Sequence, residues 1–167
     1  MLKLILPTNK YKKSFLAYMQ ELVRNKKITS AYFKEISNNF PAFVRLQKSQ
    51  IKTNSKNDVP KTQLWILNGK NIIGQGVIHH KLNKYLRSFG GHVGYSIRPS
   101  FRQKGYGTKA LRLLLKKARG IGFKKVLLAV RKENTPSIKI IEHAGGKFFK
   151  SSFINKVIYH LYWIKLD

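Results

Sequence analysis

The segment from Gly94 to Ala118, GYSIRPSFRQKGYGTKALRLLLKKA, constrains the fold more than any other part of this 167-residue chain. It passes from an apolar alternation typical of a β-strand, through a polar turn with two glycines, into a basic, leucine-rich stretch with helical periodicity. Such a turn either simply connects a strand to a helix or brings backbone N–H groups up against a phosphate. The role of Gly105 and Gly107 is therefore the central question about this sequence.

Periodicity predicts helices at the beginning of the chain and strands alternating with helices after an antiparallel hairpin. The hairpin is predicted around an Asn68-Gly69 turn, and the polar segment 47–61 is predicted to be a loop or a substrate-facing flap. We predict helices over residues 14–23, 31–36, 105–119 and 135–143, and strands over residues 62–67, 71–80, 92–98, 124–130 and 156–166.

This order predicts an α/β (α+β) fold with a mixed, mostly antiparallel central sheet flanked by helices. One right-handed crossover, from the strand at 92–98 to the strand at 124–130, would supply one parallel strand pair. A chain of 167 residues is expected to form a single domain with one core. Residues 1–60 would contribute the N-terminal helices and a loop, and residues 61–167 the core of the sheet.

The composition excludes several classes of function. There are 34 Lys+Arg against 6 Asp+Glu, a net charge of +28 that is spread along the chain. The partner or substrate is therefore expected to be anionic. The alternative is that the charge reflects the general composition of the organism's proteins and has no role in binding. No acidic residue lies between Asp58 and Glu133, which leaves no paired carboxylates or hard-metal cage there. The chain has no cysteine and no membrane-length apolar run, so we expect a cytoplasmic protein without a metal or a membrane partner.

Two phosphate-binding interpretations compete for the glycine turn. Residues 105–110 fit the dinucleotide pattern G-x-G-x-x-G/A, and Glu133 lies near the offset of its ribose-binding acid. That fold, however, places its first glycine directly after the strand, whereas residues 99–104 intervene here. The longer pattern Arg102-x-x-Gly105-x-Gly107 would instead point the N–H groups of residues 103–108 into one concavity at a helix start, which favours a pyrophosphate.

The longer pattern resembles the acetyl-CoA motif Q/R-x-x-G-x-G/A of the GNAT superfamily of N-acetyltransferases. The resemblance extends through GGHVGYSIRPSFRQKGYG, KKVLLAV, ENTPSIKIIEHAGGKF and YHLYWIKL. Together these segments are similar to a branch of uncharacterised bacterial acetyltransferases. It covers Leu64 to the C-terminus well and the N-terminal helices loosely. It implies transfer of an acetyl group from acetyl-CoA to a primary amine, by a monomer or homodimer whose residues 61–167 bind the cofactor.

The resemblance also implies which residues bind coenzyme A. Residues 103–108 would hold the pyrophosphate through their amides, and residues 95–97 would pair with the pantetheine arm like an extra strand. Asn134 would bond the pantetheine chain and could also cap the following helix. The residues expected to bind the cofactor are Tyr95, Ser96, Ile97, Arg102, Gln103, Lys104, Gly105, Tyr106, Gly107, Thr108, Asn134 and Ser137.

The implied chemistry is direct attack of a neutral amine on the acetyl thioester in a ternary complex. In many relatives a tyrosine seven residues after the asparagine protonates the leaving thiolate, but Ile141 occupies that position here. Tyr95, Tyr106, Tyr159 or water would have to replace it. For the base, His92 is the first candidate because its ordinary pKa of about 6.5 suits the task, and Glu133 is the second.

Two other functions stay open at this point. The charge is compatible with a nucleic-acid or ribosome-binding module, although no RRM, KH or helix-turn-helix signature is present. Ile141 is compatible with a GNAT-fold protein that binds acyl-CoA without catalysis. The amine acceptor is not indicated, because the resemblance is weakest in the N-terminal helices that would select it.

Overall fold

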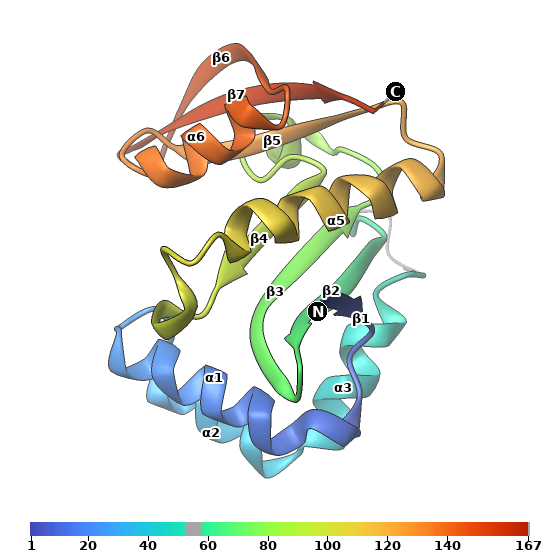
Figure 1. Ribbon diagram of the computed structural model, residues 1–167, viewed down its shortest axis with the longest axis vertical. Helices are drawn as coiled ribbons and strands as arrows, with labels where there is room; N and C mark the ends of the chain where they lie inside the picture. Colours follow the sequence, from blue (N-terminus) through green and yellow to red (C-terminus); the bar gives the residue numbers. More distant parts are fainter. Residues whose placement is uncertain (53–57, 167) are drawn as a thin grey trace.

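The computed structural model describes residues 1–52 and 58–166. Its strands form two antiparallel sheets, ordered β1-β2-β3-β4 and β5-β7-β6, and its helices pack around them (Figure 1). This is the mixed α/β architecture that the sequence predicts. The strands are β1 (Leu2–Ile5), β2 (Lys61–Asn68), β3 (Asn71–His79), β4 (Val93–Ile97), β5 (Lys125–Arg131), β6 (Lys147–Ile154) and β7 (Val157–Lys165).

The N-terminal helices cover one face of the first sheet. Helices α1 (Lys12–Arg24), α2 (Ser30–Asn38) and α3 (Phe40–Ser49) enclose an aromatic core in which the rings of Phe15 and Trp65 stack with centroids 4.2 Å apart. The first two helices confirm the sequence prediction. Helix α3 overlaps the predicted loop 47–61, of which residues 53–57 lie outside the described part of the chain.

Helix α5 (Tyr106–Ile121) lies between the two sheets in Figure 1 and contributes Leu111 and Leu114 to a second core, which also includes residues of β5 and β7. Helix α6 (Thr135–His143) adds Ile141 to the same core. Gly122, with a positive φ of 106°, ends α5, so the helix continues through Gly120 instead of stopping there.

Strands β4 and β5 do not form the expected continuous parallel pair. They meet at one point, where the His92 N–H donates to the Leu127 carbonyl over 2.7 Å and an isolated bridge joins Gly91 to Leu128. A Cβ at Gly91 would lie 2.3 Å from the Leu127 carbonyl oxygen, so only glycine permits this approach. Beyond the junction the two strands belong to separate sheets, which leaves the β5-facing edge of β4 without a ladder partner in the described part of the chain.

Other differences from the sequence prediction are local. The hairpin turn is formed by residues 69 and 70, because Asn68 already pairs with Asn71. The sequence did not indicate β1 or the short helix α4 (Lys84–Ser88), which are too short for a clear periodicity. Strand β7 lies between β5 and β6, as its apolar residues on both faces predicted. No helix in residues 1–52 and 58–166 has the length and apolar character needed to cross a membrane.

Candidate functional site

The glycine turn follows β4 and starts α5. A 3-10 turn, η2 (Pro99–Phe101), leads into residues 102–105, where Gln103 and Gly105 have positive φ values of 59° and 73°. Within the described part of the chain, the amides of residues 103–108 donate no hydrogen bond, and the first helical bond of α5 runs from Lys109 N–H to the Gly105 carbonyl. The helix has no acidic residue in its first turn. The turn therefore offers consecutive unpaired N–H donors at a positive helix terminus, as an anion site requires.

A carboxylate from α1 holds the start of this turn in place. Glu21 accepts hydrogen bonds from the Arg98 guanidinium and from both the backbone N–H and the hydroxyl of Ser100. Burial raises the pKa of Glu21, but the hydrogen bonds from Arg98 and Ser100 outweigh that effect and lower it. Sequence reasoning missed this contact, because 77 residues separate Glu21 from Arg98 and no local pattern connects them.

Two basic side chains of the turn are also tied to its backbone. Arg102 Nε donates to the carbonyl of Ile97, the last residue of β4, over 3.0 Å, and Lys104 Nζ donates to the Ser100 carbonyl over 3.0 Å. The Lys104 ammonium also lies 5.6 Å from the centre of the Phe101 ring. These contacts shape the turn and keep positive charge beside the free amides.

The two glycines of the turn differ in their surroundings. A Cβ added to Gly105 would meet nothing within 4 Å, and its positive φ is what favours glycine there. A Cβ on Gly107 would instead lie 2.9 Å from Ile140 Cδ1 of α6 and 3.7 Å from the Tyr95 ring. Gly107 is therefore explained by close packing of α5 against α6 and β4, whereas Gly105 is explained by the backbone conformation of the turn.

Tyr95 of β4 lies close to both α5 and α6, because a Cβ on Gly107 would be 3.7 Å from its ring and Ser137 lies beside its hydroxyl. Burial raises the pKa of Tyr95, and the nearby Ser137 hydroxyl opposes this in part. The two hydroxyls do not have the geometry of a hydrogen bond, so the Tyr95 hydroxyl is buried without a partner in the described part of the chain. A buried, unpaired hydroxyl costs stability.

Asn134 begins α6 at the end of β5. Its side-chain oxygen accepts the Ser137 N–H over 3.3 Å, which confirms the predicted helix cap, and its side-chain nitrogen donates no hydrogen bond within residues 1–52 and 58–166. On β4, Ser96 lies on the opposite face from Tyr95, where its hydroxyl is 3.1 Å from that of Tyr18 in α1. The structure thus places residues 95–97, residues 102–108, Asn134 and Ser137 around the ends of β4 and β5 where α5 and α6 begin.

His92 joins the two sheets. Its Nδ1 accepts the backbone N–H of Leu127 over 2.9 Å, and its ring packs against Phe123 and Trp163. Burial, together with the charges of His79 and Arg87, lowers the pKa of His92 from 6.5 to about 4. The neutral ring therefore carries its proton on Nε2, and His92 could accept a second proton only by giving up the Leu127 bond.

A family model for the acetyltransferase (GNAT) domain matches residues 12–147. The protein belongs to the GNAT acetyltransferase family. The matched range includes α1, the glycine turn, Asn134 and α6, which are the elements that form the candidate site. No curated protein sequence matches the chain significantly.

Solved structures of other GNAT acetyltransferases share the fold. The microcin self-immunity acetyltransferase MccE, in complex with acetyl-CoA and AMP, is 18% identical with a TM-score of 0.72, and the match covers 98% of this chain and 92% of that one. Mycobacterium smegmatis RimJ, in complex with CoA-disulfide, is 18% identical with a TM-score of 0.71 and coverages of 98% and 81%. A Salmonella typhimurium enzyme that modifies the N-terminal serine of a 50S ribosomal subunit protein is 14% identical with a TM-score of 0.68 and coverages of 99% and 95%.

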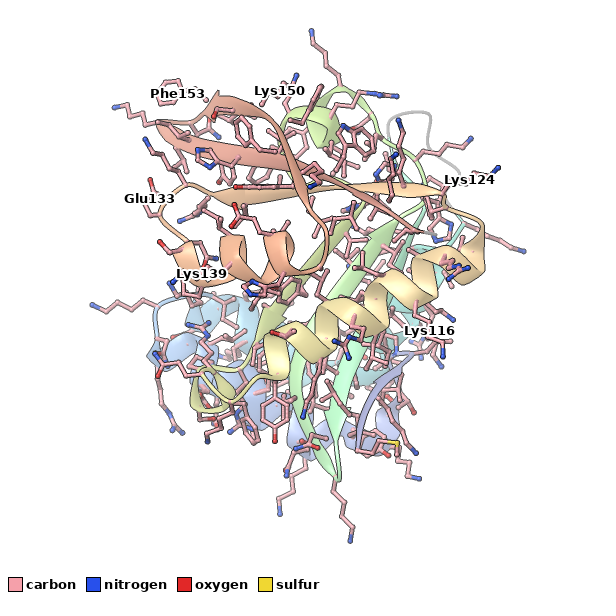
Figure 2. All side chains as sticks on the ribbon, turned by 45° about the horizontal axis from the view of Figure 1, so that its top comes forward. Lys116, Lys124, Glu133, Lys139, Lys150 and Phe153 are labelled. Atoms are coloured by element: carbon pink, nitrogen blue, oxygen red, sulfur yellow. The ribbon has the colours of Figure 1, made fainter. Side chains whose placement is uncertain are left out.

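The other residues considered for the acid and the base in this GNAT protein each have contacts of their own. Ile141 is 2% exposed and packs in the core below α6. The Tyr106 hydroxyl accepts a hydrogen bond from Asn68, and the Tyr159 ring packs edge-on against Phe89. Glu133 is exposed in the turn after β5 and points outward in Figure 2. The catalytic assignments of His92, Glu133 and Tyr95 stay predictions.

Proposed function

We propose that the protein is an N-acetyltransferase that moves the acetyl group of acetyl-CoA to a primary amine within a ternary complex. The observation that carries the proposal is the row of unpaired amides at residues 103–108, at the start of a helix with no acidic residue in its first turn. A pyrophosphate is the ligand that such a turn fits best, because every group it presents is a donor. Arg102 and Lys104 add positive charge next to it.

The rest of the cofactor would extend from this turn along β4. Residues 95–97 present a strand edge without a ladder partner in the described residues, so the pantetheine amides can pair with it as an added strand would. The free amide nitrogen of Asn134 and the Ser137 hydroxyl would bond the pantetheine chain from the α6 side. The thioester would then lie towards the junction at His92, where the separation between the two sheets closes.

In the reaction, the neutral amine attacks the thioester carbonyl, a C–N bond forms, and the C–S bond of the tetrahedral intermediate breaks. One proton leaves the attacking nitrogen and one reaches the coenzyme A thiolate. The protein contributes mainly by holding both substrates in position. Tyr95 is the proposed acid, because its raised pKa keeps the hydroxyl protonated and no protein group in the described chain occupies it.

Two residues are candidates for the base that accepts the proton of the amine. His92 remains the first predicted base, with the condition that its Nδ1 must release the Leu127 N–H. Glu133 is exposed to solvent and needs no such rearrangement, but it would have to turn inward. An amine that has lost its proton to water before binding would need neither residue.

The test is acetyl-CoA binding by calorimetry, with Gly105→Glu as the decisive variant. A glutamate there adds a negative charge beside the pyrophosphate and a side chain to a residue whose φ is 73°, so affinity should fall at least 100-fold. Gly122→Ala, at the other end of α5, is a matched control at a positive-φ glycine far from the turn. Unchanged binding in Gly105→Glu would show that the pyrophosphate site is wrongly placed.

Catalysis needs a second measurement, namely release of free thiol from acetyl-CoA across a panel of primary amines. Amine-dependent release supports the transferase. Tight acetyl-CoA binding with no release for any amine would instead favour a non-catalytic acyl-CoA-binding protein, the alternative that Ile141 suggests. Salt-sensitive RNA binding without acetyl-CoA binding would favour a nucleic-acid or ribosome-binding module.

A further inference from the structure

A small pocket of about 250 Å³ lies beside the junction of the two sheets. It is lined by residues from five different segments, namely Leu82, Arg87, His92, Lys125 and Trp163. Trp163 of β7 pairs with Leu127 of β5, whereas its neighbours Tyr162 and Ile164 belong to the core formed with α5. Because successive side chains of a strand alternate, the pocket opens on the face of the second sheet that α5 and α6 leave uncovered.

The polar side chains that line the pocket are all donors. Arg87 and Lys125 carry positive charge, and His92 presents Nε2–H because its Nδ1 already accepts the Leu127 N–H. Helix α4 and strands β5, β6 and β7 contain no Asp or Glu. A pocket with only donors and cations fits an anionic ligand and repels a cationic one.

Aromatic rings form one wall of the same surface. The Lys125 ammonium lies 4.9 Å from the centre of the Trp163 ring, and the Phe149 ring, 53% exposed, stands 6.4 Å from that of Trp163. Lys150 lies 5.5 Å from the centre of the Phe149 ring. Flat rings alternating with cations are suited to stacking a nucleobase while neutralising a phosphate.

We propose that this pocket is the acceptor subsite and that it takes a phosphorylated nucleoside group carried by the amine acceptor. The inference rests on the proposed function, because the pocket adjoins the closed end of the separation between β4 and β5, where the thioester would lie. The phosphate binds Arg87, Lys125 and His92 Nε2–H, and the base stacks on Trp163. A nucleotide at this place also accounts for part of the net charge of +28.

AMP is a suitable probe, and Trp163 provides the signal. The chain has two tryptophans, and Trp65 is fully buried among the N-terminal helices. Quenching of tryptophan fluorescence by AMP would therefore report stacking on Trp163, and Trp163→Phe should abolish it. AMP should bind at least tenfold more tightly than either adenosine or inorganic phosphate, because each of these supplies only half of the contacts.

Two pocket variants and one matched control locate the site. Arg87→Gln and Lys125→Gln should each weaken AMP binding about tenfold, as the loss of one charge-assisted contact predicts. Lys124→Gln removes the same charge one residue away, at a position that precedes β5 and does not line the pocket, and should change the affinity less than twofold (Figure 2). Equal effects of Lys124→Gln and Lys125→Gln would overturn the site, because they would indicate only general attraction by the net charge.

Competition separates this pocket from the cofactor site. Saturating acetyl-CoA should leave AMP binding unchanged, whereas displacement would mean that AMP occupies the coenzyme A site and would overturn the proposal. Absence of quenching, or equal affinity for phosphate and AMP, would do the same. An oligonucleotide that binds more tightly than AMP but ignores Lys125→Gln would indicate an RNA surface elsewhere and also contradict the pocket.

The two proposals can fail independently. If AMP binds as expected while acetyl-CoA does not bind at all, the nucleotide pocket stands and the transferase proposal falls. If acetyl-CoA binds and is lost in Gly105→Glu while AMP gives no quenching, the transferase proposal stands and the acceptor class is wrong.

Discussion

The glycine turn and the pocket beside the sheet junction are built in opposite ways. The turn presents backbone amides from consecutive residues, 103–108, and its side chains mainly hold the loop in shape. The pocket is lined by residues of α4, β5 and β7, by Leu82 before α4 and by His92 just before β4. The glycine turn would bind the pyrophosphate of the proposed cofactor, which is the same in every reaction. The side chains of the pocket can differ between proteins that use different acceptors.

This difference indicates how each region should tolerate mutation. In the turn, a side-chain change matters only if it alters the backbone or fills the space of the phosphate. At the junction and the pocket, single side chains carry both the packing and the recognition. The following predictions test that contrast, from the largest expected effect to the smallest.

The junction should make stability depend on pH through His92. Because the folded-state pKa of about 4 lies below 6.5, the unfolded chain binds the proton more readily, and stability falls as pH drops from about 6.5 to 4. The full shift corresponds to about 3 kcal/mol. Urea unfolding of the wild type and of His92→Gln at both pH values measures the effect.

His79 also has a pKa lowered by burial, so the difference between the two proteins, and not the wild-type slope alone, isolates His92. His92→Gln should be less stable at pH 7 and show a shallower pH dependence. Identical pH dependence in the two proteins would show that His92 is not held neutral by the junction.

Removing the proposed acid should separate catalysis from stability. Tyr95→Phe should lower kcat about 100-fold without weakening acetyl-CoA binding, because the hydroxyl is proposed to act on the leaving thiolate. The same change should leave stability unchanged or higher, since the hydroxyl is buried without a partner in the described chain. Thiol release with an active amine and thermal unfolding give the two readouts.

Tyr85→Phe, on the exposed side of α4, is a matched control that removes an unrelated hydroxyl. A large loss of stability in Tyr95→Phe would mean that the hydroxyl serves packing, and full activity would exclude it as the acid.

Loosening the support of the turn should have an intermediate effect. Glu21→Gln removes the charge that binds Arg98 and Ser100, so we expect acetyl-CoA affinity to fall about tenfold, roughly 1.4 kcal/mol, with kcat nearly unchanged. Glu35→Gln, an exposed position on α2, removes the same charge away from the turn. If both variants bind acetyl-CoA equally well, Glu21 does not position the site.

The smallest effect is expected for Gly107→Ala. The new methyl group would meet the flexible end of Ile140, which can move, so acetyl-CoA affinity should change less than about threefold and stability by about 0.5 kcal/mol. Calorimetry and thermal unfolding measure both. A loss comparable to that of Gly105→Glu would show that Gly107 also borders the bound phosphate.

Most of the order of elements and the glycine turn could be predicted from the sequence because their signals are local. The stripe of Phe15, Tyr18 and Met19 predicted α1, and the positions of Pro99, Gly105 and Gly107 predicted a turn leading into α5. The contacts of Glu21 and His92 could not be predicted, because Arg98 and Leu127 are distant in the chain. Ile141 was noted from the sequence as a missing acid, but only the fold shows that it is a core residue.

The sequence by itself determined most of the succession of strands and helices, the amide-rich turn and the excess of positive charge, since each depends on residues that are neighbours in the chain. The tertiary structure decided that β4 and β5 separate beyond His92, that Tyr95 has a buried hydroxyl without a protein partner, and that Arg87, Lys125 and Trp163 share one pocket. These features arise from packing between segments that are distant in the sequence. The surroundings of such a side chain depend on elements that no local sequence pattern connects with it.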